Sequence, residues 1–175
     1  GADGSGVQVV NWLADSGSKS LLVRPGSEAR VHFRNTRSGS KYQLDFSIYS
    51  DRGPTSSHNF YVVLNGMGAD NNGGDFLAYR GGRATNDTAL VSYDGVRAAP
   101  GWAAVGTNHM TQAWQHHRIV FDPNVPSLSV YVDDMATPVL VNSGTARSET
   151  PMPTMMRIVN EGNSTRSGLE VELET

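Results

Sequence analysis

The side chains best suited to chemistry lie at alternating positions in a few short segments, with apolar residues between them. We take the following as candidate ligand-binding residues: Arg30, His32, Arg34, Asp45, Tyr49, Tyr61, Tyr79, Trp102, His116 and Arg118. Aromatic rings pack against the C–H faces of sugars, whereas amide, carboxylate and guanidinium groups hydrogen-bond sugar hydroxyls. Arginine can also grip a carboxylate or a sulfate. These residue types fit a surface that binds a polysaccharide, with an acidic one as an option, and a solvated sheet face with weak Arg–Asp pairs explains them about as well.

The pair of adjacent histidines after Trp114 raises the question of whether they do chemistry or fasten a hairpin. Side chains alternate along a strand, so His116 shares a face with Trp114, and His117 shares the opposite face with Ile119. Ile119 is expected in the core, which places His117 at the inner edge of that face, where it can bond a backbone carbonyl. A structural role is therefore favoured for His117, and His116 remains the candidate for ligand contact.

The two other tryptophans are expected in different places. Trp102 follows Pro100 and Gly101, so we expect it in a loop, where it either stacks on a ligand or covers one end of the core. Trp12 has the apolar neighbours Val10 and Leu13 and is expected in the core.

One glycine-rich segment, NGMGADNNGGDF, could hold a metal ion. It offers the oxygen ligands Asp70, Asn72 and Asp75, and calcium prefers six to eight oxygen ligands. The segment lacks the length and the terminal glutamate of an EF-hand loop, and turn-forming Asn and Asp residues explain it equally well. Calcium is the cofactor that the sequence offers, and whether it binds stays open.

The elements that must position these residues show a period of two almost throughout, which is typical of β-strands. The strands are expected at residues 29–34, 42–49, 60–65, 75–80, 89–94, 116–122, 128–134, 138–142, 155–161 and 169–175. The first two are expected to form a hairpin across the turn RSGS. No segment has a capped helical pattern. We predict an all-β fold, an antiparallel sandwich of two sheets (a jelly roll) over residues 7–175, with residues 1–6 as a flexible end.

The bulk composition narrows the partners. The 175 residues have a net charge of -3, from 14 basic and 17 acidic residues, which gives no reason to expect nucleic-acid binding. No apolar run approaches the ~20 residues that cross a bilayer, so no membrane partner is expected. Cysteine is absent, which excludes disulfides and thiolate chemistry. The chain begins with Gly1, and we expect it to be a piece of a longer protein.

The region around the two histidines resembles a known family. The pattern of Trp114, His116 and His117, then RIVFD, then LSVYVDD ending in Asp133 and Asp134, is similar to laminin-G-like domains of the concanavalin A-like lectin/glucanase superfamily. MRIVNEGNSTRSGLEVELE resembles the closing hairpin of that superfamily. The resemblance implies a sandwich whose concave sheet forms a sugar-binding groove. Because the candidate residues lie on polar strand faces that lack the carboxylate pattern of the glucanases, we expect a non-catalytic, secreted, bacterial carbohydrate-binding module attached to a polysaccharide-degrading enzyme.

Three other functions have sequence features for or against them. The glucanases of that superfamily carry alternating Glu and Asp residues on one strand, because retaining hydrolysis needs two carboxylates about 5.5 Å apart. Here the closest run is GLEVELET, which has no aspartate, so hydrolysis is disfavoured and no catalytic residue is assigned. A polysaccharide lyase acting on a polyuronate, with Gln115, His116 and Tyr49 in its site, is the alternative. A laminin-G-like module that recognises proteins is the third reading.

Overall fold

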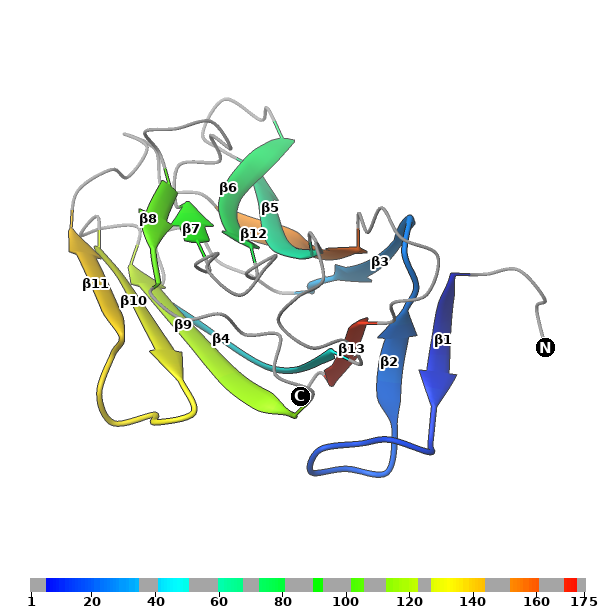
Figure 1. The fold of residues 1–175 in the computed structure, drawn as a ribbon. Helices are drawn as coiled ribbons and strands as arrows, with labels where there is room; N and C mark the ends of the chain where they lie inside the picture. The colour runs from blue at the N-terminus through cyan, green and yellow to red at the C-terminus, as the bar shows by residue number, and fades with distance from the viewer. Residues whose placement is uncertain are drawn as a thin grey trace.

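The structure is a computed structural model, which describes residues 6–34, 41–50, 60–67, 73–80, 90–92, 102–105, 113–122, 127–143, 152–160 and 169–172. These residues contain thirteen strands, all paired antiparallel, and no helix. The strands form two sheets that face each other, with the seven-stranded sheet along the lower part of Figure 1 and the six-stranded sheet above it. The predicted all-β sandwich is therefore confirmed. The described residues include no helix long and apolar enough to cross a membrane.

The seven-stranded sheet is built from segments far apart in the sequence. Its order is β1 (Val7–Val10), β2 (Ser20–Val23), β13 (Leu169–Glu172), β4 (Tyr42–Ser50), β9 (Gln115–Asp122), β10 (Ser127–Val132) and β11 (Leu140–Ser143). The strands β4 and β9 lie near the middle of this sheet, and each is hydrogen-bonded to a strand on both sides.

The six-stranded sheet has the order β3 (Ser27–His32), β12 (Met152–Asn160), β5 (Phe60–Met67), β6 (Gly73–Arg80), β7 (Leu90–Ser92) and β8 (Trp102–Ala104). The strand β12 lies between β3 and β5 in this sheet and pairs with both.

The core fills the space between the two sheets. Its side chains come from alternate positions of the strands, as a period of two requires, and they are Val23, Ala29, Phe46, Ile48, Val62, Leu64, Tyr79, Val105, Ile119, Val130, Met156 and Ile158. A slip of one residue would turn this apolar set to solvent, so burial fixes the register of the central strands.

The predicted hairpin between residues 29–34 and 42–49 is wrong. The strand β3 pairs with β12 at the edge of the six-stranded sheet, whereas β4 pairs with β13 and β9 in the other sheet. Both segments alternate because both face the same core, one from each side. Alternation specifies which residues are buried, and it does not specify which strand is the hydrogen-bonding partner.

The expectation for Trp12 is also wrong. The strand β1 ends at Val10, and Trp12 lies in the following loop with 68% of its surface exposed. The strands β1, β2 and β8, of three or four residues each, were not predicted.

Candidate functional site

Three cross-strand pairs project from the outer face of the seven-stranded sheet. Phe46 and Ile48 of β4 and Ile119 of β9 point into the core, so the residues between them point outward. The register of β4 and β9 then sets outward residues side by side. We call the resulting three pairs the outer ladder: Asp45–Arg118, Ser47–His116 and Tyr49–Trp114.

The first pair of the outer ladder is an ion pair. Arg118 Nε donates to Asp45 Oδ1 at 2.6 Å, and Gln43 Nε2 donates to Asp45 Oδ2 at 2.6 Å. The side chains of Arg118 and Asp45 are 31% and 37% exposed. Ion pairs exposed to this degree add about 0–1 kcal/mol to stability. The pair is therefore better explained as a fixed set of charged hydrogen-bonding groups than as a stabilising contact.

The second pair places a histidine between two polar partners. His116 Nδ1 lies 3.0 Å from Ser47 Oγ, and His116 Nε2 lies 3.2 Å from Asp15 Oδ2. The contact with Asp15 has the distance of an ion pair without the geometry of a hydrogen bond, and which of Ser47 Oγ and His116 Nδ1 donates depends on the tautomer of the ring. The His116 side chain is still 53% exposed.

Two loops meet at this histidine. Asp15 comes from the loop between β1 and β2, and Asp133 Oδ1 accepts a hydrogen bond from the His116 backbone N–H at 3.0 Å. Asp133 has a φ of 59°, in the left-handed region that Asp tolerates better than most residues. The chain therefore turns sharply at the end of β10, and the loop after it borders the outer ladder.

The third pair is aromatic. The rings of Tyr49 and Trp114 lie 5.6 Å apart, tilted by 51°, and both residues are only partly buried. Such a pair offers ring surface at the edge of a polar site, which is what sugar C–H groups pack against. The Trp114 indole nitrogen is shielded from solvent and has no hydrogen-bond partner in the part of the chain that the structure describes.

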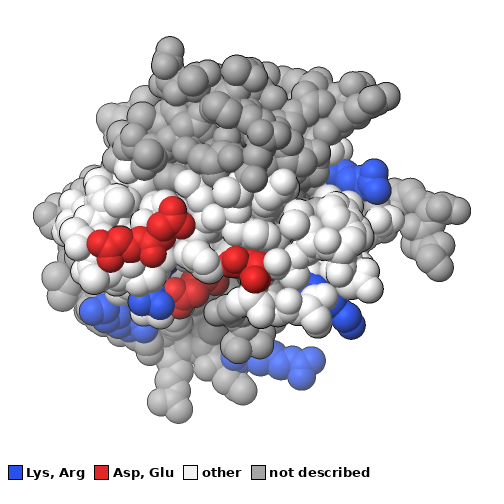
Figure 2. Space-filling model, turned by 60° about the horizontal axis from the view of Figure 1, so that its bottom comes forward, with Lys and Arg blue, Asp and Glu red and all other residues white. Residues whose placement is uncertain are grey.

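A pocket of about 340 Å³ opens over the polar part of the ladder. It is lined by Asp45, Phe46, Ser47, His116, His117, Arg118 and Met135. Its volume falls in the range of about 300–1,000 Å³ that is usual for small-ligand sites. The face that comes forward in Figure 2 is the lower one of Figure 1, and acidic side chains gather near its middle.

The described side chains that bond one another around this pocket carry more negative than positive charge. Asp15, Asp45 and Asp133 supply three carboxylates, and Arg118 supplies one guanidinium. The neighbouring Asp134 adds a fourth carboxylate in the loop after β10.

The charge of Asp134 persists to low pH. The backbone N–H of Ala136 donates to Asp134 Oδ1 at 2.9 Å, and the Thr137 side chain adds a second hydrogen bond. These bonds, to Ala136 first, lower the pKa of the Asp134 carboxyl below its usual value, because they favour the ionised form. The loop beside the site is thus acidic over the physiological range.

The structure brings four of the predicted residues together and separates others. Asp45, Tyr49, His116 and Arg118 all belong to the outer ladder. Arg30 and His32 lie on β3 at the edge of the other sheet, and the exposed Arg34 follows that strand. The expectation that all of them share one surface is therefore wrong, for the same reason as the predicted hairpin.

The charges on β3 are used within the six-stranded sheet. Arg30 Nε bonds Glu28 Oε1, and Arg157 Nη1 of the neighbouring β12 bonds Glu28 Oε2 at 3.3 Å. Tyr61 is partly buried and lies on the outer face of β5, because the next residue, Val62, belongs to the core. Neither Arg30 nor Tyr61 can extend the outer ladder.

Tyr79 was predicted as a surface residue and is a core residue instead. Its exposed fraction is 0%, and its ring packs edge-on against Phe46 and His117 at 5.9 and 5.3 Å. Burial raises the pKa of the Tyr79 phenol well above its usual value of 10. Tyr79 pairs with Val62 of β5, so it faces the same core, and it cannot touch a ligand on the outer surface.

The inward position predicted for His117 is confirmed. The residue is 1% exposed, its ring stacks on Phe46 at 5.2 Å, and its Nδ1 lies 3.2 Å from the Tyr79 hydroxyl. This hydrogen bond joins β9 to β6 of the opposite sheet. His117 thus fastens the two sheets together, and its bond to a backbone carbonyl stays a prediction.

The remaining predicted residues have undescribed side chains or positions. Trp102 begins β8 and pairs with Ser92 of β7, so the expectation that it lies in a loop is wrong. Asp75 belongs to β6, and for both residues the structure describes only the backbone. Asp70 and Asn72 lie outside the described residues, so the calcium site stays a prediction. Within the described ranges, no group of three or more His, Asp or Glu residues is arranged to hold a metal ion.

Four residues of the site, Ser47, Trp114, Asp15 and Asp133, were not among the candidates. Alternation correctly placed Trp114 on the face of His116, and it also places Ser47 between Asp45 and Tyr49, but neither was chosen as a ligand-binding residue. Asp15 and Asp133 reach His116 from loops, and the sequence carries no signal of that approach.

The architecture and the outer ladder define a class of fold. Two antiparallel sheets of seven and six strands pack face to face, and a polar pocket lies on the outer face of the larger sheet. This is an antiparallel two-sheet β-sandwich, the architecture that the resemblance implied.

Comparison with known proteins supports the fold and does not assign a family. No family model matches the sequence, and no curated protein sequence matches it significantly. Among solved structures, the chain is similar to Cip1, a cellulose-induced protein, with a TM-score of 0.60, 14% identity, and coverage of 96% of this chain and 84% of Cip1. A legume lectin-like domain from Entamoeba histolytica gives a TM-score of 0.61 at 10% identity, covering 95% of this chain and 86% of that domain. The botulinum neurotoxin D binding domain gives a TM-score of 0.64 at 14% identity, covering 97% of this chain but 40% of that one.

Proposed function

We propose that the outer ladder binds a carbohydrate chain without cleaving it. The observation that carries the proposal is the alignment of an ion pair, a held histidine and an aromatic pair along two adjacent strands. Sugars need planar hydrogen-bonding groups for their hydroxyls and ring surface for their C–H faces. The outer ladder supplies both on one rigid sheet face.

The charge of this face favours a neutral glycan over an acidic one. The carboxylates of Asp15, Asp45 and Asp133 outnumber the guanidinium of Arg118, which is already held by Asp45. A uronate or sulfate would meet repulsion here, whereas neutral hydroxyls can donate to the carboxylates. The acidic polysaccharide considered from the sequence is therefore the less suitable ligand.

The similar structures give independent support of a general kind. Their names include a legume lectin-like domain and a botulinum neurotoxin D ligand-binding domain in complex with N-acetylneuraminic acid. These names describe the other proteins, and for this chain they support a sugar-binding role on the same type of fold. Secretion, a bacterial source and attachment to a polysaccharide-degrading enzyme remain proposals based on the resemblance.

Affinity gel electrophoresis on a panel of neutral and acidic polysaccharides tests the proposal. We expect at least one neutral polysaccharide, such as a glucan, xylan or mannan, to retard the protein, and Trp114→Ala to abolish the retardation. Tyr61→Ala, an aromatic change on the other sheet, is the matched control and should migrate as the unchanged protein does. If no polysaccharide retards the protein, or if only the Tyr61 change matters, the proposal is wrong, and a protein-recognition module becomes the better account.

One feature of the site favours a lyase as the second candidate. His116 is half exposed, lies 3.2 Å from Asp15 and is one cross-strand pair away from Arg118. In a lyase, Arg118 would neutralise the carboxylate of the uronate while His116 abstracts a proton from the sugar. Gln115 cannot join it, because the Gln115 side-chain oxygen is buried and alternation turns it to the opposite face. Elimination in a polyuronate would raise absorbance near ~235 nm. A flat trace with alginate and pectin would exclude this candidate for those substrates.

A further inference from the structure

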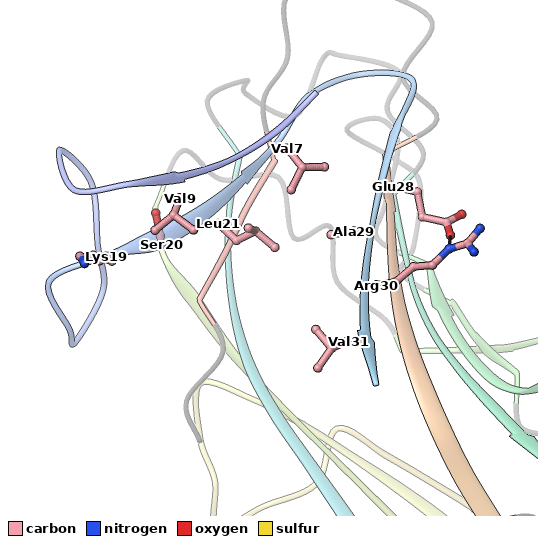
Figure 3. Close-up of a pocket in the computed structure, with 9 residues that line it drawn as sticks. All are labelled: Val7, Val9, Lys19, Ser20, Leu21, Glu28, Ala29, Arg30 and Val31. Atoms are coloured by element: carbon pink, nitrogen blue, oxygen red, sulfur yellow. Dashed lines mark hydrogen bonds and ion pairs between the residues drawn. The ribbon is translucent and has the colours of Figure 1, made fainter. Parts of the chain in front are cut away.

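A second pocket lies at one open edge of the sandwich, away from the outer ladder. The strand β1 is an edge strand of the seven-stranded sheet, and β3 is an edge strand of the six-stranded sheet. The sandwich is therefore open between these two edge strands. The pocket between them has a volume of about 530 Å³. In Figure 3 it lies between β1 and β2 on one side and β3 on the other.

The pocket is wedge-shaped because the two edges meet at one end. Gly6, just before β1, packs so closely on Ser27 of β3 that an added Cβ would collide with the Ser27 side chain. The backbone N–H of Arg24 also donates to the Gly6 carbonyl at 2.7 Å, which fixes this narrow end. From there β1 and β3 diverge toward Val9 and Val31 (Figure 3).

The walls of the wedge are aliphatic. Val7, Leu21, Ala29 and Val31 point into it, as Figure 3 shows, and Val7, Leu21 and Val31 are only partly buried. Val9, which pairs with Leu21, is 69% exposed at the open end. Aliphatic surface left open in a concave site is the usual mark of a site for an apolar ligand.

One cation, Lys19, lines the pocket just before β2. Glu28 and Arg30 of β3 also line it, but in Figure 3 their side chains lie on the far side of β3 from Val7 and Leu21 and bond each other. Glu28 also bonds Arg157, so it does not offset the charge of Lys19. An apolar wedge with a cation at its rim complements a ligand that has an aliphatic tail and an anionic head.

We propose that this wedge is a binding site for a free fatty carboxylate, with its alkyl chain between β1 and β3 and its head group near Lys19. The proposal is independent of the sugar-binding proposal, because it uses other residues on another side of the sandwich. A neutral hydrocarbon would leave Lys19 without a counter-charge. An extended peptide would fill the depth of the pocket only if it carried a long aliphatic side chain.

Isothermal titration calorimetry with octanoate, decanoate and dodecanoate, each below its micelle concentration, tests the proposal. Burial of methylene groups should raise affinity about three- to fourfold per added methylene, until the wedge is full. Decanol, with the same tail and no charge, should bind about three- to tenfold more weakly than decanoate, as expected for the loss of a charge-assisted contact.

Variants separate the tail contact from the head contact. Val7→Phe fills the narrow end and should reduce decanoate affinity at least tenfold. Val9→Asp changes an exposed side chain and should repel the carboxylate without affecting folding. Lys19→Gln should weaken decanoate binding and leave decanol binding unchanged. Trp114→Ala, which changes the outer ladder, is the control and should bind decanoate normally.

Some outcomes would overturn the proposal. These are the absence of a chain-length dependence, equal binding of decanoate by folded Val9→Asp protein, and binding that Lys19→Gln leaves unaltered. A protein that ignores decanoate but dimerises through β1, or that binds only to vesicles of anionic phospholipid, would assign the wedge to a second copy of the chain or to a membrane surface instead.

Discussion

His116 and His117 are neighbours on one strand, and they belong to two different regions of the molecule. His117 is 1% exposed and fits between Phe46 and Tyr79, where its position follows from packing between the sheets. The His116 side chain is 53% exposed and is held by polar partners from β4 and from the loop after β1. The same two strands, β4 and β9, thus present an apolar inner face and a polar outer face.

The difference shows how this fold separates stability from binding. The inner face is fixed by close packing, so any change of volume is felt there. Apart from the buried Ser47, the residues of the outer ladder are only partly buried or exposed, and exposed ion pairs add little to stability. Changes on the inner face should therefore lower the free energy of unfolding, and changes on the outer face should lower affinity for a glycan.

The largest effect is expected for Ile119→Ala on the inner face. Ile119 is 0% exposed, and truncation of a fully buried isoleucine costs about 2–5 kcal/mol through lost burial and the cavity left behind. Urea unfolding should show this loss, while the glycan affinity of the folded protein stays within about twofold. Val120→Ala, the next residue on the opposite face, is the control and should cost less than about 1 kcal/mol. Equal losses for the two variants would contradict the assignment of faces.

The next effect is expected for Trp114→Ala on the outer face. Loss of an aromatic side chain that stacks on a ligand commonly costs about 2 kcal/mol of binding, or more than tenfold in affinity. Trp114→Phe keeps a ring next to Tyr49 and should retain most of the affinity. Titration calorimetry with the polysaccharide identified on the gels measures both. If alanine and phenylalanine behave alike, the aromatic ring is not the contact.

A moderate effect that depends on pH is expected for Tyr79→Phe. The change removes the 3.2 Å contact with His117, which should cost about 1 kcal/mol near neutral pH. The pKa of Tyr79 in the folded protein is raised above its value in the unfolded chain, so the stability linked to it is complete below about pH 10 and is lost as pH rises further.

Alkaline unfolding is the measurement for this prediction. Above about pH 10 the unfolded state of the unchanged protein can ionise this phenol, whereas the variant has no phenol there to ionise. The stability of Tyr79→Phe should therefore fall less steeply with pH. Parallel slopes for the two proteins between neutral and alkaline pH would show that Tyr79 is not buried as described.

The smallest effect on stability is expected for Asp45→Asn. The amide keeps the shape of the side chain and removes the charge that holds Arg118 at 2.6 Å. Because the pair is about one-third exposed, the free energy of unfolding should change by less than about 1 kcal/mol. Affinity for a neutral glycan should nevertheless fall several-fold, because Arg118 is no longer held in place. A large loss of stability with normal glycan binding would show that the Asp45–Arg118 pair stabilises the fold and does not take part in binding.

The sequence predicted which residues are buried better than it predicted which strands are partners. Alternation placed Phe46, Ile48 and Ile119 in the core and His117 beside them, because burial requires a period of two. Alternation carries no information on pairing, so Arg30 on β3 was wrongly joined to the surface of β4.

The candidate site was predictable only where it lies on strands. Asp45, Tyr49, His116 and Arg118 were recognised from their residue types and spacing. Tyr79 and Tyr49 are both tyrosines, but the side chain of Tyr79 points into the core. A prediction from residue type alone therefore placed Tyr79 wrongly. The contact of Asp15 with His116 depends on the path of a loop, which local pattern does not determine.

An NMR titration of ¹⁵N-labelled protein tests the central claim, that the outer ladder is a glycan-binding face. An oligosaccharide of the polysaccharide that retards the protein is added stepwise, and the amide signals of β4 and β9 and the indole N–H signal of Trp114 are followed. The account predicts saturable shifts of the Ser47, His116 and Trp114 signals, while signals of β3 and β12 on the other sheet stay in place. Shifts confined to β3 and β12, with the outer ladder unchanged at saturation, would contradict it.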